Sequence, residues 1–140
     1  MEPTQRRPSR ILTLAIVELT LTTAYIHLTL GGVLFTLNAA GYAALAAAFA
    51  MAAVVPLSLV RRFDWLPRVG LVAYTASTIG AYLVMGPHFS LGWVAKAIEV
   101  AILTLLVVDL RRAYGSPAGL VRAALSSLRF GGEPRPMRPA

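Results

Sequence analysis

Hydrophobic residues gather in four long runs, which are separated by short stretches of polar residues, glycine and proline. Each run has roughly the 17 to 25 residues that an α-helix needs to cross about 30 Å of hydrocarbon. The pattern predicts membrane-spanning helices over residues 11–30, 33–56, 69–85 and 92–110. The predicted fold class is therefore all-α, an integral membrane four-helix bundle.

Glycine, proline and arginine mark where these helices are expected to end. Gly31 and Gly32 predict a very tight turn, Pro56 ends the second helix because it lacks a backbone donor, and residues 61–68 are typical of a basic loop. The first run is longer than the roughly 7 to 15 apolar residues of a signal peptide, and it contains Glu18. We expect this run to be retained as a helix.

After the fourth run, residues 113–130 predict a short amphipathic surface helix, with Ser116 as its N-cap and Pro117 at its first position. Its apolar residues recur at helical spacing: Leu120, Val121, Ala124, Leu125 and Leu128. We expect this helix to lie on the inner leaflet. The ends of the chain, residues 1–10 and 131–140, are rich in proline and arginine and are predicted to be disordered tails.

Composition favours lipid over water as the solvent of this chain. Hydrophobic residues make up 57% of it and charged residues only 14%, against about 25% charged residues in ordinary soluble domains. A soluble domain of this size buries only about two thirds of its unfolded surface, so apolar patches would remain in contact with water. We expect the lipid bilayer to cover them.

Arginine residues flank the apolar runs on one side of the predicted bundle, in segments 6–10, 61–68 and 111–112. The two connections on the other side contain no lysine or arginine. This distribution predicts a multi-pass protein of the cell membrane with an N-in/C-in orientation, both termini being cytoplasmic. The arginines would then contact anionic headgroups. No nucleic-acid partner is expected, because no groove-reading or base-stacking motif accompanies the net charge of +7.

The chain offers few residues for enzymatic chemistry. It contains no cysteine, which excludes disulfides, thiolate metal sites and cysteine nucleophiles. We find no nucleophile elbow, phosphate-binding loop or metal-binding signature. The sequence therefore predicts a non-enzymatic protein without a metal or another cofactor.

Polar residues within the predicted helices provide the candidate site. A charged residue at the bilayer centre costs about 2.5 to 3.5 kcal/mol, so Glu18, Lys96 and Glu99 each require a partner, a cavity or a function. A rise of about 1.5 Å per residue places most of the other polar residues in one layer of the outer half of the membrane. The candidate intramembrane polar site comprises Glu18, Tyr25, His27, Asn38, Tyr82, Lys96 and Glu99.

Lys96 and Glu99 lie three residues apart on one helical face, close enough to form an ion pair. Three interpretations remain open. The two residues neutralise each other, or Glu99 forms an ion or proton site with His27 and Asn38, in which histidine changes its charge near neutral pH. In the third interpretation, the layer is a contact with another protein.

Glu18 is expected at the depth of three hydroxyl groups of the third helix, which would donate hydrogen bonds to it: Thr75, Ser77 and Thr78. Thr22 and Tyr25 share its face of the first helix, whereas Thr20, Thr23 and His27 line the opposite face. A helix that is polar on two faces is poorly suited to face lipid on either. This pattern favours self-association or contact with another subunit.

Two resemblances to known families follow from short motifs. Ile26-His27-Leu28, Gly31-Gly32, Leu34-Phe35, Leu37-Asn38 and Gly41-Tyr42 together resemble a pattern in small prokaryotic four-helix membrane proteins of unknown function, which implies a fold and no activity. The segment LAIVELTLTTAY is similar to the first helix of small multidrug resistance transporters, whose membrane-embedded glutamate exchanges protons for cationic drugs. That resemblance implies the same role for Glu18, but the family's second-helix motif is missing.

Two functional hypotheses from different classes follow. In the first, the protein is a non-enzymatic accessory or self-associating structural subunit, whose polar faces contact copies of itself (a homo-oligomer) or another membrane subunit. In the second, it is a proton-coupled carrier of a small or cationic solute, which uses Glu18 or the layer of Glu99 and His27.

Overall fold

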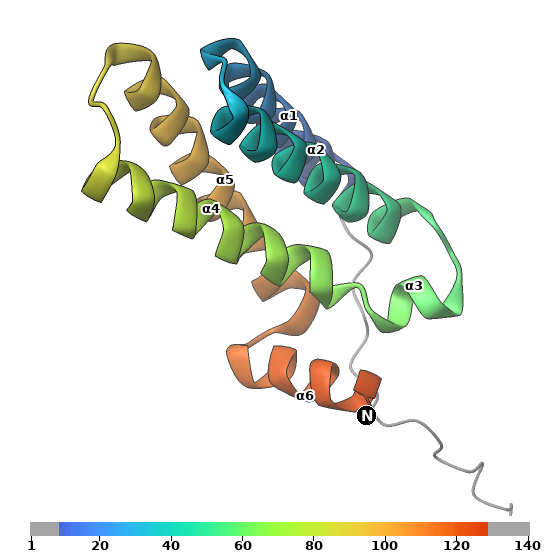
Figure 1. The fold of residues 1–140 in the computed structure, drawn as a ribbon. Coiled ribbons are helices and arrows are strands. Elements are labelled where there is room, and N and C mark those ends of the chain that lie inside the picture. The colour runs from blue at the N-terminus through green and yellow to red at the C-terminus, as the bar shows by residue number, and fades with distance from the viewer. Residues whose placement is uncertain (1–8, 129–140) are drawn as a thin grey trace, which may run out of the picture.

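A computed structural model describes residues 9–128, which form six α-helices (Figure 1). Their bounds are α1 Arg10–Leu30, α2 Val33–Val54, α3 Ser58–Arg62, α4 Trp65–Met85, α5 Ser90–Tyr114 and α6 Pro117–Leu128. The predicted tail at residues 131–140 lies outside the described residues, as do residues 1–8 of the other tail.

Four of these helices, α1, α2, α4 and α5, are long and apolar enough to cross a membrane. They lie side by side in alternating directions, with α1 and α4 each in contact with both α2 and α5 (Figure 1). Large apolar side chains cover much of the outer surface. The chain is therefore an all-α integral membrane protein, and its apolar helices contact the lipid bilayer.

The turn between α1 and α2 consists of Gly31 and Gly32, as the sequence predicts. Their φ angles are 71° and 83°, a region in which side chains with a Cβ atom are strained. Glycine at both positions lets the chain reverse within two residues. The α1–α2 contact that follows is the most extensive between any two helices.

The predicted basic loop at residues 61–68 is largely helical, which corrects the predicted start of the third span at residue 69. α3 contains Arg61 and Arg62, and α4 begins at Trp65. Pro67 falls in the first turn of α4, where a backbone N–H has no partner within the helix and its absence costs nothing. A proline that predicts a loop when only the sequence is considered can thus lie in the first turn of a helix.

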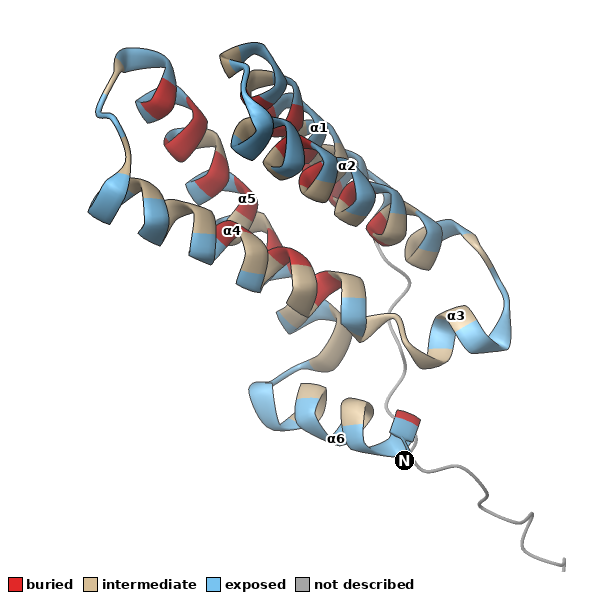
Figure 2. Ribbon diagram, in the orientation of Figure 1, coloured by how far each residue is buried: buried red, intermediate tan, exposed pale blue. Residues whose placement is uncertain are grey.

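The bundle core is formed by inward-facing apolar residues of all four long helices (Figure 2). Its fully buried large side chains include Ile16 of α1, Phe49 of α2, Leu71 of α4, and Ile102 and Leu106 of α5. The alanine-rich α2 presents Ala39 and Ala46 to the interior. Small side chains let helices approach closely, which is the main source of helix association in lipid.

At the end of the bundle next to α6, Arg68 of α4 is buried and donates to Asp109 of α5 at 2.7 Å. Asp109 is thus paired with an arginine of the 61–68 segment. Arg68 also approaches Asp64 at 3.3 Å, and Tyr114 donates to Asp64 at 2.7 Å. The pairs connect α4 to α5 at this end.

The predicted surface helix is α6, and Ser116 accepts a hydrogen bond from the Gly119 amide, as expected for a capping residue. Its position against the bundle comes from Ser127, which is contacted by Trp65 at 3.0 Å and by Arg62 at 2.6 Å. This contact divides the predicted apolar face of the helix into a half-buried part and an exposed part. Leu120 and Ala124 are half-buried, whereas these three apolar residues are exposed: Val121, Leu125 and Leu128.

Candidate intramembrane polar site

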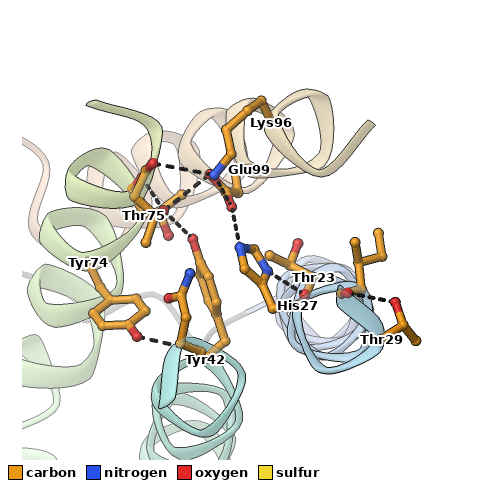
Figure 3. A network of polar contacts seen from close by, with 11 residues as sticks. Thr23, His27, Thr29, Tyr42, Tyr74, Thr75, Lys96 and Glu99 are labelled. Carbon is orange, nitrogen blue, oxygen red and sulfur yellow. Dashed lines mark hydrogen bonds and ion pairs between the residues drawn. The ribbon is translucent and has the colours of Figure 1, made fainter. Parts of the chain in front are cut away.

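Glu99 is the centre of a buried polar cluster in the bundle interior (Figure 3). It lies one turn after Ala95, one turn before Ile102 and two turns before Leu106 on the inward face of α5, so the helical repeat fixes its direction. Its exposed fraction is 0%. A carboxylate in such a place must be compensated by nearby donors.

Lys96 provides the main compensation, as the three-residue spacing predicts. Its Nζ atom lies 2.7 Å from Oε1 and 2.6 Å from Oε2 of Glu99. The same ammonium group lies 5.3 Å from the ring centroid of Tyr82 and 3.4 Å from the carbonyl oxygen of Thr78. Gly92 leaves room for the Tyr82 ring, because a Cβ atom there would collide with it. The buried ammonium group is thus held by a carboxylate and an aromatic face.

His27 approaches the same carboxylate from α1, where it follows Thr20 and Thr23 on the inward face. Its Nδ1 atom lies 2.8 Å from the carbonyl oxygen of Thr23, and its Nε2 atom lies 3.8 Å from Oε1 of Glu99. The ring also contacts the aromatic rings of Phe35 and Tyr42. These contacts fix both the position of the imidazole and its orientation toward Glu99.

A chain of hydroxyl groups from α2 and α4 completes the surroundings of the carboxylate. The Tyr42 and Thr78 hydroxyl oxygens are 2.6 Å apart, and Thr78 Oγ1 lies 3.1 Å from Oε2 of Glu99. Thr78 Oγ1 also lies 2.9 Å from the backbone carbonyl oxygen of Thr75, so its single hydrogen is donated either to that oxygen or to Glu99, and Tyr42 can donate to Thr78 in both cases. The Tyr74 ring packs edge-on against Tyr42, and its hydroxyl donates to the backbone carbonyl of Asn38 at 3.2 Å. All four long helices thus contribute to the cluster.

Three buried side-chain oxygen atoms have no hydrogen-bond partner within residues 9–128: Thr23 Oγ1, Asn38 Oδ1 and Thr75 Oγ1. Thr23 lies one turn before His27, Asn38 one turn before Tyr42, and Thr75 one turn before Thr78. Buried polar atoms without partners are uncommon in proteins and costly. Here they adjoin the cluster on three different helices.

The structure brings together four of the seven predicted site residues: His27, Tyr82, Lys96 and Glu99. Asn38 is adjacent to them through Tyr74, but within the described chain its amide contacts neither His27 nor Glu99. Tyr25 is 67% exposed on the outer face of α1, opposite to His27, and is not part of the cluster. Tyr25 lies two residues before His27, about 200° around the helix, and both cannot face inward.

Glu18 also faces outward, and its expected hydrogen bonds with the hydroxyls of the third helix are wrong. Ser77 donates to its own helix, Thr78 belongs to the Glu99 cluster, and Thr75 Oγ1 has no partner in the described chain. The buried stripe of α1 passes through Ile16 and Thr20, which directs Glu18, midway between them, to the other side.

Tyr42 and Thr78 were not predicted as site residues. The signal that could have found them is helical spacing, because Tyr42 follows Asn38 by four residues and Thr78 precedes Tyr82 by four. Tyrosine and threonine in a membrane helix are equally compatible with packing or with backbone hydrogen bonds, so this signal is weak by itself.

The cluster contains an imidazole ring, a carboxylate paired with an ammonium group, and a chain of hydroxyl groups that can both donate and accept hydrogen bonds. Among the described residues, no three histidine or acidic side chains lie close enough together to hold a metal ion.

In comparisons with known proteins, no family model, no curated protein and no solved structure matches the chain. The two family resemblances therefore depend on their short motifs alone.

Proposed function

We propose that this protein is a non-enzymatic, self-associating subunit of the cell membrane, and that its copies meet through the outer face of α1. A single observation carries the proposal: Glu18 lies on that face, exposed, in the middle of a membrane-spanning helix. Glu18 is eight residues from the start of α1, which corresponds to a depth of about 12 Å in a hydrocarbon layer of about 30 Å.

A carboxyl group at this depth requires a hydrogen-bond donor, and residues 9–128 of the same chain do not provide one. Among residues 9–128 its side chain forms no hydrogen bond or ion pair, and the nearby Thr22 hydroxyl donates to the Glu18 backbone carbonyl instead. Exposure of the ionised group to lipid costs about 2.5 to 3.5 kcal/mol. A protein contact at this position removes that cost.

The residues around Glu18 form a regular seam that suits a second copy of the same helix. They alternate at spacings of three and four residues, and all are exposed: Ile11, Leu14, Glu18, Leu21, Tyr25 and Leu28. This is the heptad spacing at which two helices pack side by side in a left-handed pair. A single polar residue within such a seam fixes the register of the partner helices.

The symmetry of a dimer explains how two Glu18 side chains would form a hydrogen bond with each other. A two-fold interface joins the same patch of both copies, so copies with the same orientation bring their Glu18 side chains to the same depth. One protonated and one ionised carboxyl group then share a hydrogen bond. The seam needs no other chain to complete it.

Cysteine cross-linking tests the seam, because the natural chain contains no cysteine. In membranes at low protein density, Leu14→Cys and Leu21→Cys should each give disulfide-linked dimers on oxidation. Leu37→Cys, on the exposed face of α2, is the matched control and should stay monomeric. Equal cross-linking at all three positions, or none at Leu14 and Leu21, would contradict the proposal.

Substitution of Glu18 separates this function from that of a proton-coupled carrier. Glu18→Gln should keep the dimer, since an amide both donates and accepts, whereas Glu18→Leu should weaken it about 3- to 10-fold, as interhelical polar contacts contribute about 0.6 to 1.5 kcal/mol. A carrier instead predicts that Glu18→Gln abolishes the release of protons on addition of a cationic solute while the dimer remains.

We further propose that both termini are cytoplasmic, since the start of α1, the basic segment 61–68 and α6 lie at one end of the bundle (Figure 1). A reporter enzyme fused to either terminus should then be active only in the cytoplasm, and one inserted at His88 only outside. A cytoplasmic reporter at His88 would refute this orientation.

A further inference from the structure

The geometry of His27 determines which of its nitrogen atoms carries hydrogen. Nδ1 lies 2.8 Å from the carbonyl oxygen of Thr23, and a carbonyl oxygen only accepts hydrogen bonds. Nδ1 must therefore be the protonated nitrogen. In a neutral imidazole Nε2 then has a lone pair and no hydrogen.

This lone pair faces the carboxylate of Glu99, whose Oε1 atom is 3.8 Å from Nε2. Two acceptors thus face each other in a place where His27 is 4% exposed and Glu99 is 0% exposed. We propose that the space between His27 Nε2 and Glu99 Oε1 is a binding site for one exchangeable proton, which joins α1 to α5 within the membrane. This proposal goes beyond self-association and does not depend on it.

The contacts of Glu99 decide where the proton is held. Both oxygens of Glu99 accept from Lys96, and Oε2 lies 3.1 Å from the hydroxyl of Thr78. Carboxylate oxygens that accept these hydrogen bonds act as acceptors and carry no hydrogen of their own. The proton, delivered by a hydronium ion that leaves as water, therefore bonds to Nε2 of His27, and Glu99 remains a carboxylate.

The other groups around His27 accommodate the resulting imidazolium. Phe35 and Tyr42 place aromatic rings 6.2 and 5.6 Å from its centroid, and aromatic faces attract cations. Lys96 disfavours the imidazolium, because protonation of His27 adds a second cation next to the Lys96–Glu99 pair, which is already neutral. The ionisable groups in and next to the cluster, from every helix packed on His27, are Tyr42, Tyr74, Tyr82, Lys96 and Glu99. Glu99 is the one acid among them, so a single carboxylate attracts the imidazolium and is shared with Lys96.

Histidine nitrogen NMR and carboxylate infrared spectroscopy test the site in the full-length protein, reconstituted in phospholipid nanodiscs. His88→Asn removes the other histidine, which is exposed and contacts the Tyr82 ring with its centroid 5.5 Å away. At pH 8.5 we expect hydrogen on Nδ1 only, and on acidification to pH 5 hydrogen on both nitrogens, with Glu99 still ionised. The Glu99 carboxylate stretching band should shift in step with the new Nε2 proton.

The matched variant is His27→Gln, in which this shift of the Glu99 band should be lost. If that variant fails to fold, the spectra of the protein with native His27 decide the question on their own. Hydrogen on Nε2 at pH 8.5, protonation of Glu99 before His27, or a Glu99 band that does not respond when His27 gains its proton would each overturn the proposal.

Discussion

Replacement of Lys96 by methionine tests how strongly the buried cluster stabilises the fold. The ammonium group lies 2.6 Å from Oε2 of Glu99, and at an effective dielectric constant of about 20 this attraction is roughly 6 kcal/mol. The cost of desolvating both charges offsets much of it. The substitution leaves a buried carboxylate with Thr78 and His27 as its remaining neighbours, so we expect the free energy of unfolding to fall by about 3 to 4 kcal/mol.

The same substitution should matter much less when Glu99 is already glutamine. No charge is then left behind, and we expect a loss of about 1 kcal/mol, which gives a coupling of about 2 to 3 kcal/mol between the two positions. Unfolding in mixed detergent micelles, followed by circular dichroism for all four combinations, measures this coupling. Val94→Met, at a lipid-facing position of α5, is the control and should change stability by less than about 0.5 kcal/mol. Additive effects within about 0.5 kcal/mol would refute the reasoning.

Two further substitutions probe the ends of the bundle. Arg68→Leu leaves the buried carboxylate of Asp109 without its cation, so the unfolding free energy should fall by about 3 kcal/mol. Arg61→Leu, at an exposed position, is the control and should change it by less than about 0.5 kcal/mol. Equal effects of the two substitutions in the same unfolding assay would contradict the role of Arg68. Gly92→Ala should lower the thermal unfolding temperature, because its Cβ atom would meet the Tyr82 ring, at a cost of about 1 to 3 kcal/mol. Gly80→Ala, with open space around it, should be neutral or stabilising by up to about 1 kcal/mol, and a loss there as large as at Gly92 would exclude the steric explanation.

The four long helices could be predicted because their apolar runs match the thickness of a bilayer, a constraint that holds regardless of how the helices pack. Their rotation could not be predicted as easily. In lipid the outer surface of a bundle is as apolar as its interior, so hydrophobic periodicity carries little information about which face is inside. α1 illustrates this, since Glu18 and His27 are both polar and only packing shows that His27 is the inward one.

The pairing of Lys96 with Glu99 was predictable because both residues are on one helix, where spacing determines distance. The contacts of Glu99 with His27 and Thr78 were not predictable in the same way, because they depend on the relative depth and rotation of three helices. The start of α4 was misplaced for a local reason, since Pro67 and Arg68 in a first helical turn resemble a loop in sequence. The outward seam on α1 became visible only when the exposed residues were known.

The two-glycine turn between α1 and α2 also bears on the order in which the protein assembles. A connection this short lets the first two helices associate as a hairpin as soon as both are in the membrane, before α4 and α5 have been synthesised. That hairpin already holds His27 and Tyr42 on its inner surface, with no acidic group opposite them. The later arrival of α5 supplies Glu99 together with its own cation, as an internally neutral pair. The buried charges of the cluster thus enter the half-formed bundle as a neutral pair, next to polar groups that α1 and α2 already provide.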